Sequence, residues 1–142
     1  MTTINQILAI KGNQVHTIDP ETPIIDAVKE MAEKKVGALV VLEGDDIKGI
    51  ITEQDFTRRV ILKDRDTDDT KVKDVMTRQV SVINPAQTTN EGMAIMTDKC
   101  VRHLPVIQDN KMIGLISIGD LVKEVISEQE HIIEQLEQYI HG

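Results

Sequence analysis

The chain has 142 residues and a formal net charge of -8. A surface that binds nucleic acid or an anionic membrane is therefore not expected, because both rely on clustered cations, and no apolar run approaches the roughly 20 residues of a membrane span. The apolar share of 40% is almost wholly aliphatic, with one Phe, one Tyr and one Cys, which predicts an aliphatic core in a cytoplasmic protein without an internal disulfide.

The first half of the chain predicts alternating strands and helices. An apolar strand ends at an Asp-Pro pair, where the proline ring removes a hydrogen-bond donor. A helix follows, because Ile24, Val28 and Met31 recur at helical spacing. Two strands joined by a Glu-Gly-Asp-Asp turn come next, and Thr52 is placed to cap a second helix. The predicted strands are 15–18, 38–42 and 47–52.

The second half predicts the same elements after a polar connection. Residues 63–73 are rich in Asp, Thr, Lys and Arg, so we expect a solvated linker with no core of its own. A strand then ends at Asn-Pro, a helix carries Met93 and Met96, and Ser117 is placed to cap the last helix. The predicted strands are 80–83, 103–107 and 112–117.

An internal repeat explains this likeness. Shifting the sequence by 65 places aligns residues 15–61 with 80–126 without a gap, and about three identities are expected by chance in such a window. The identical positions are Val15/Val80, Ile18/Ile83, Pro20/Pro85, Met31/Met96, Lys34/Lys99, Val36/Val101, Leu39/Leu104, Val41/Val106, Gly49/Gly114, Ile51/Ile116, Asp55/Asp120, Val60/Val125 and Ile61/Ile126.

The expected fold class is α/β (α+β). Each β-α-β-β-α repeat of about 50 residues buries too little surface to be stable alone, so we expect two copies to pack together. The predicted organisation is a first domain at 1–63 that includes an N-terminal helix, a linker at 64–73, a second domain at 74–127 and a helical extension at 128–142.

One motif occurs in both repeats at the same register. A glycine, two apolar residues and a hydroxyl residue precede an aspartate three positions later, as Thr52 and Asp55 and again as Ser117 and Asp120. A carboxylate accepts hydrogen bonds from both hydroxyls of a ribose, and a helix start with a hydroxyl suits a phosphate. The alternative is helix capping, which a repeated fold would also repeat.

This spacing is similar to the nucleotide-binding signature of CBS domains, named after cystathionine β-synthase. The second repeat adds Val-Arg-His-Leu-Pro-Val, which resembles the family's second strand, where basic residues reach ligand phosphates. The resemblance covers about residues 4–126. It implies two pseudo-twofold related CBS repeats packed sheet to sheet, called a Bateman module, followed by an extended C-terminal helix, and pairs of this kind usually dimerise.

In the family, each cleft takes its hydroxyl and carboxylate from one repeat and its first and second strands from the other. Carried over, this implies one site of Thr52, Asp55, Val82, Ile83, Arg102, His103 and Pro105, and another of Ser117, Asp120, Thr17, Ile18, Gly37 and Ala38. Because the first repeat has Gly37 and Ala38 where the second has Arg102 and His103, we expect the second site to hold phosphates less well or to stay empty.

Arg58 and Arg59 follow Asp55 by a helical turn, so at least one is expected to point toward the same cleft, and Arg58 is included in the predicted site; a solvated helix face is the alternative. His103 has the alternative of an ordinary sheet histidine. We predict no enzyme and no metal site, because the sequence has no phosphate loop, nucleophile elbow or metal-ligand spacing.

The C-terminal tail carries an apolar seam at alternating spacings of four and three, which predicts a partner helix or, alternatively, packing on its own module. Its residues are Ile118, Val122, Val125, Gln129, Ile132, Leu136 and Tyr139.

The sequence therefore predicts a regulatory, energy-sensing module that binds AMP, ADP or ATP between its repeats and forms a homodimer, with a regulated protein partner. S-adenosylmethionine and dinucleotides share the adenosine part and stay open as ligands. The rival hypothesis is a dimeric interaction scaffold with empty clefts that acts through its C-terminal helix.

Overall fold

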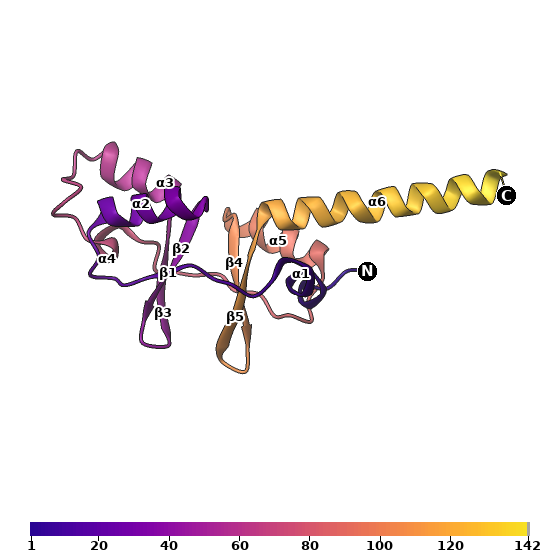
Figure 1. Cartoon of the computed structure of the whole chain (residues 1–142), viewed down its shortest axis with the longest axis horizontal. Coiled ribbons are helices and arrows are strands. Elements are labelled where there is room, and N and C mark those ends of the chain that lie inside the picture. Colours follow the sequence, from indigo (N-terminus) through magenta and orange to yellow (C-terminus); the bar gives the residue numbers. More distant parts are fainter. Residues whose placement is uncertain (142) are drawn as a thin grey trace. The chain divides into compact units, whose positions relative to one another are not determined.

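The computed structural model describes residues 1–141 as two compact units of mixed α and β structure (Figure 1). One unit is Gln14–Val80. The other joins Met1–Asn13 to the chain from Ser81 onward. The expected N-terminal helix therefore packs with the second repeat and not, as the sequence analysis groups it, with the first.

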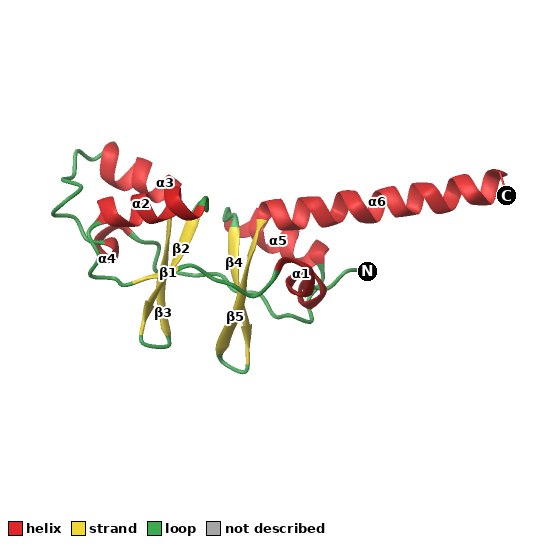
Figure 2. Cartoon of the chain, in the orientation of Figure 1, coloured by secondary structure: helices red, strands yellow, loops and turns green. Residues whose placement is uncertain are grey.

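The unit Gln14–Val80 is built on a three-stranded sheet in the order β1-β2-β3 (Figure 2), with β1 parallel and β3 antiparallel to β2. Its strands are β1 Thr17–Ile18, β2 Ala38–Glu43 and β3 Asp46–Thr52. Its helices are α2 Ile24–Lys34, α3 Glu53–Asp55, the π-helical η1 Phe56–Ile61 and α4 Val72–Val75. These elements confirm the predicted strand and helix order, although the first strand is shorter than 15–18.

Helix α2 covers this sheet because its apolar residues share one face. Ile24, Ala27 and Met31 are buried against Leu39 and Ile51. The helix ends at a residue in the left-handed conformation, which is one of the ordinary ways for a helix to end. Leaving the helix in this way directs the chain into β2.

The predicted solvated linker is only partly correct. Residues 63–69 are mostly exposed, but Thr70 is buried and Val72 and Val75 belong to the core of the first repeat. Val72 and Val75 are three residues apart and so share one face of α4, which packs beneath β3 although lysines and an aspartate surround them in the sequence. The expectation of a linker without core residues is thus wrong for its last residues.

The other unit is built on a two-stranded antiparallel sheet (Figure 2). Its elements are α1 Ile4–Lys11, α5 Thr89–Lys99, β4 His103–Gln108, β5 Lys111–Ser117 and α6 Ile118–His141. In place of the predicted strand 80–83, Ile83 alone forms a parallel bridge to Val106. Its core is aliphatic, with Ile4, Leu104 and Leu121 fully buried.

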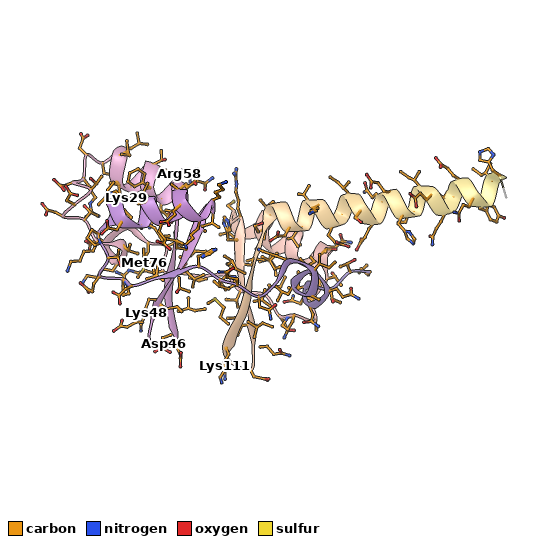
Figure 3. The ribbon with its side chains drawn as sticks, in the orientation of Figure 1. Lys29, Asp46, Lys48, Arg58, Met76 and Lys111 are labelled. Atoms are coloured by element: carbon orange, nitrogen blue, oxygen red, sulfur yellow. The ribbon has the colours of Figure 1, made fainter. Side chains whose placement is uncertain are left out.

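Helices α1 and α4 have equivalent places in the two units. Leu8 of α1 lies against Gly114 of β5, and Met76, which ends α4 and is labelled in Figure 3, lies against Gly49 of β3. A Cβ at either glycine would come within 2.8 Å of these side chains. Glycine at this repeated position therefore allows a short helix to pack directly on the strand. Each helix precedes one repeat in sequence and packs on the other.

Helix α6 continues as a single rod well past the other elements of its unit (Figure 1), which confirms the predicted extended C-terminal helix. Across residues 1–141, the structure has no helix that is both long and apolar enough to cross a bilayer.

Candidate functional site: two carboxylate clusters

The first cluster forms where β3 enters α3. Thr52 caps the helix by accepting the Asp55 N–H at 3.1 Å through its hydroxyl oxygen. In return, Oδ2 of Asp55 accepts the Thr52 N–H at 3.0 Å and the Thr52 hydroxyl at 3.1 Å. This is a capping box, so the capping interpretation of the motif is confirmed for this repeat, and it fixes the carboxylate at the end of the strand.

The other oxygen of Asp55 has one partner that the sequence analysis missed, Thr77, and one that it considered, Arg59. Thr77 donates its hydroxyl to Oδ1 at 3.2 Å, and Arg59 Nε lies 3.8 Å from the same atom. Thr77 is held there by two backbone hydrogen bonds with Ile50. Both oxygens of the carboxylate therefore have partners within the repeat, and Asp55 is only 8% exposed.

Of the two arginines considered for this cluster, Arg59 is the one at the carboxylate. It also donates to the carbonyl oxygens of Val75 at 3.1 Å and Met76 at 3.0 Å, so it ties the helix after Asp55 to the end of α4. Arg58 is exposed on the same helical segment (Figure 3).

The second cluster forms where β5 enters α6. Oδ2 of Asp120 accepts the Ser117 N–H at 2.8 Å, and the Ser117 hydroxyl accepts the Asp120 N–H at 3.2 Å. The same Oδ2 also receives Lys11 Nζ at 2.7 Å, and Lys11 donates in addition to the Leu115 carbonyl oxygen at 2.7 Å. Burial alone would raise the pKa of Asp120, but the hydrogen bonds from Lys11 and Ser117 outweigh it and hold the pKa below its ordinary value.

His103 belongs to the surroundings of this second cluster. It stands opposite Ser117 in the β4–β5 ladder. Burial lowers the pKa of His103, and the nearby charges of Lys11 and Arg102 lower it further against the opposing effect of Asp120. The neutral form of the imidazole is therefore favoured, and two basic side chains lie near it.

The remaining predicted residues divide between the two units. In the first, Thr17 and Ile18 form β1, the Gly37 carbonyl accepts the Glu53 N–H at 3.1 Å, and Ala38 pairs with Thr52. In the second, Val82 is exposed, Ile83 is core, and Pro105 is buried and accepts the Ile83 N–H at 3.0 Å. Gly37 and Ala38 thus lie beside Thr52 of their own repeat, and the assignment of residues to sites across the repeats stays a prediction.

Lys11 and Thr77 gave little signal in the sequence. They lie outside the aligned repeat, and Lys11 is 109 positions from Asp120. The one indication among these residues is the repeated glycine, Gly49 and Gly114. A glycine in a strand is typical of a close approach by another segment, and here that segment lies outside the aligned repeat. Among residues 1–141, no three His, Cys, Asp or Glu side chains are grouped in a way that could hold a metal ion.

The CBS-domain family profile matches residues 9–62 and 72–127, which is most of the chain in two consecutive copies. The chain belongs to the CBS-domain family. CBS pairs are generally regulatory or sensor modules, and relatives made only of CBS domains are typically non-catalytic.

Known CBS proteins cover nearly the whole chain. It is 39% identical over 150 residues to "CBS domain-containing protein CBSX3, mitochondrial" of Arabidopsis thaliana, covering 99% of this chain and 73% of that protein. A CBS-domain protein of Burkholderia ambifaria MC40-6 has a solved structure with a TM-score of 0.87 and 49% identity, covering 90% of this chain and 96% of that one. A CBS-CP12 protein of bloom-forming cyanobacteria, described as hexameric, has a TM-score of 0.76 and 29% identity, covering 84% and 66%.

Proposed function

We propose that this CBS pair is a regulatory module that binds an adenine nucleotide, AMP, ADP or ATP, through the carboxylates of Asp55 and Asp120. The observation that carries the proposal is the duplication of a fixed carboxylate beside a strand-end hydroxyl. Two of the donors to Asp55, the hydroxyls of Thr52 and Thr77, are neutral. The two hydroxyls of a ribose replace them one for one, without exposing a buried charge.

Arg102 and His103 are the proposed phosphate contacts, since they are the basic pair of the family's second strand. A micromolar dissociation constant corresponds to about -8 kcal/mol. At 100 times that concentration, a nucleotide that binds only the folded state raises the free energy of unfolding by about 2.7 kcal/mol, so a thermal shift screens AMP, ADP and ATP quickly.

Calorimetry on two variants tests the assignment of Asp55. Asp55→Asn removes the charged acceptor and should weaken nucleotide binding at least tenfold. Thr77→Val removes the hydroxyl that competes with the ribose and should strengthen it. Asp46→Asn, an exposed carboxylate at the tip of the β2–β3 hairpin, is the matched control and should leave the affinity unchanged. If wild-type affinity persists in Asp55→Asn, or if no nucleotide binds the wild type, the proposal fails.

Self-association through α6 is a second candidate function, and a specific observation favours it. Beyond Leu121 the helix is exposed along an apolar face three columns wide, with the large side chains Ile126, Ile132, Ile133, Leu136, Tyr139 and Ile140 between 51% and 87% exposed. A face of this width is typical of helices in bundles, whereas two-stranded coiled coils use two columns. We infer that the chain forms homo-oligomers through this helix, as a dimer or larger.

Sedimentation analysis of two variants with equal charge change tests this role. Ile133→Lys places a cation on the apolar face and should dissociate the oligomer, whereas Glu134→Gln, on the next residue, should not. Nucleotide binding that survives in dissociated Ile133→Lys would show that the two functions are independent. A monomeric wild-type protein at high concentration would refute the self-association.

A further inference from the structure

The two carboxylate clusters differ in the partner that the preceding short helix supplies. Since Leu8 and Met76 occupy the same place against equivalent glycines, Ala9 corresponds to Thr77. Alanine has no hydroxyl to give to Oδ1 of Asp120, and Lys11, two residues later, donates instead to Oδ2, the oxygen that also accepts the Ser117 N–H. Asp55 therefore receives a neutral hydroxyl donor from this segment, whereas Asp120 receives a cationic donor.

The polar groups of the second cluster are only partly used. A lysine ammonium has three N–H donors, and Lys11 spends two of them, on Asp120 and on the Leu115 carbonyl. Asp120 takes both of its hydrogen bonds on Oδ2, and Oδ1 receives no donor from residues 1–141. One free acceptor and one free cationic donor therefore lie side by side, and both side chains are accessible, at 24% and 34% exposure.

The surroundings of this pair add positive charge. Lys11 and Arg102 each lie close enough to His103 for their charges to lower the pKa of the histidine, whose burial lowers it most. Asp120 lies in the first turn of α6, and the positive end of the helix dipole there also favours an anion. Lys11, Arg102 and the helix start together outweigh the single carboxylate, so an additional anion is acceptable beside Asp120.

We propose that Lys11 sets the ligand preference of the Asp120 cluster toward a ribose that carries one free hydroxyl beside a phosphate. The hydroxyl donates to Oδ1 of Asp120, and the phosphate accepts from Lys11. An unmodified ribose diol gains less there, because Lys11 already occupies Oδ2. This inference rests on the proposed nucleoside-binding function and gives the two clusters different ligands.

A site-resolved NMR titration of the full chain tests the preference. The amide N–H groups of Ser117 and Thr52 each donate to the carboxylate of their own cluster, so their resonances report the two clusters separately. The ligands are AMP, adenosine 2′,5′-bisphosphate and adenosine 3′,5′-bisphosphate. At Ser117 we expect one of the bisphosphates to bind at least tenfold more tightly than AMP in the wild type.

Lys11→Met should abolish this preference by weakening that bisphosphate at least tenfold while AMP binding at Ser117 is kept or strengthened. Lys99→Met, which removes another ion-paired lysine of the same unit, is the control and should preserve the preference. Lys11→Gln, shorter and polar, provides a second test should the methionine variant not fold.

Three results would overturn the inference. AMP could bind at Ser117 as tightly as both bisphosphates, the preference could persist in Lys11→Met, or both kinds of ligand could weaken equally, which would give Lys11 a purely structural role. Nucleotide shifts at Thr52 with none at Ser117 would refute this inference and leave the proposed function standing. No shift at either amide would refute both.

Discussion

Replacing the repeated glycine with alanine should have very different effects in the two repeats. In Gly49→Ala the new methyl would lie 2.6 Å from the carbonyl oxygen of Thr77. That oxygen is backbone and accepts the Ile50 N–H at 3.0 Å, so it cannot move without loosening the two hydrogen bonds between Ile50 and Thr77. In Gly114→Ala the three atoms nearest to the methyl are all side-chain carbons of Leu8, and the nearest, a terminal carbon at 2.7 Å, can rotate away.

The magnitudes follow from these contacts. Overpacking costs about 1–3 kcal/mol and each weakened hydrogen bond up to about 1 kcal/mol, while removing glycine from a strand returns about 0.5–1 kcal/mol. We expect Gly49→Ala to lower the free energy of unfolding by about 2–4 kcal/mol and Gly114→Ala by about 0–1 kcal/mol. For a chain of this length, roughly 3 °C of melting temperature corresponds to 1 kcal/mol.

Differential scanning calorimetry of the two variants and a control gives the comparison. Gly119→Ala is the control, because a methyl there meets nothing closer than 3.6 Å and lies in the first turn of α6. It should raise the stability by about 0.5–1 kcal/mol. An equal loss in Gly49→Ala and Gly114→Ala would refute the reasoning, because the only difference between the sites is whether backbone or a side-chain end must give way.

Three further predictions concern single groups. Because burial and Lys11 lower the pKa of His103, the unfolded chain binds a proton at this residue at a higher pH than the folded chain does. The free energy of unfolding should therefore fall as the pH drops below 6.5. In urea unfolding, His103→Gln should lose less free energy of unfolding between pH 7.5 and pH 5 than the wild type. Thr89 is fully buried with no hydrogen-bond partner for its hydroxyl among the described residues, so Thr89→Val should be neutral or up to about 1 kcal/mol stabilising in the same assay. Hydrogen bonds from Lys71 and Lys73 lower the pKa of Glu21 to about 2, and a carboxyl NMR titration of the variant lacking both lysines should move it back toward 4.5; an unchanged value would contradict this origin.

The fold could be predicted from the sequence largely because it is duplicated. A proline after each first strand, a hairpin turn and a capping hydroxyl occur twice, and each copy supports the interpretation of the other. Thr52 and Ser117 begin their helices as expected. These signals are local, so they survive without knowledge of which segments meet in space.

The exchange of the two short helices could not be predicted in the same way. Helix α4 contributes Val72 and Val75 to the core, and α1 contributes Ile4, Ile7 and Leu8. Two or three aliphatic side chains can pack against either sheet. The apolar pattern of the short helices therefore does not indicate which repeat each one covers. Lys11 ends α1 and Thr77 follows directly after α4, so these two partners were missed for the same reason.

The difference between the two clusters follows from where the duplication ends. Within the aligned repeat, the strand, the glycine, the hydroxyl and the carboxylate are repeated, so the two carboxylates are positioned alike. The short helices lie outside it, and there Thr77 corresponds to Ala9 and, at the same shift, neutral Gln79 corresponds to Lys11. The repeated part can therefore keep two equivalent acceptors while the flanking part gives each a partner of different charge. If the Lys11→Gln variant keeps the ligand preference at Ser117 unchanged, this division of roles is wrong. The ligand preference of each cluster must then depend on the basic residues at β4 alone.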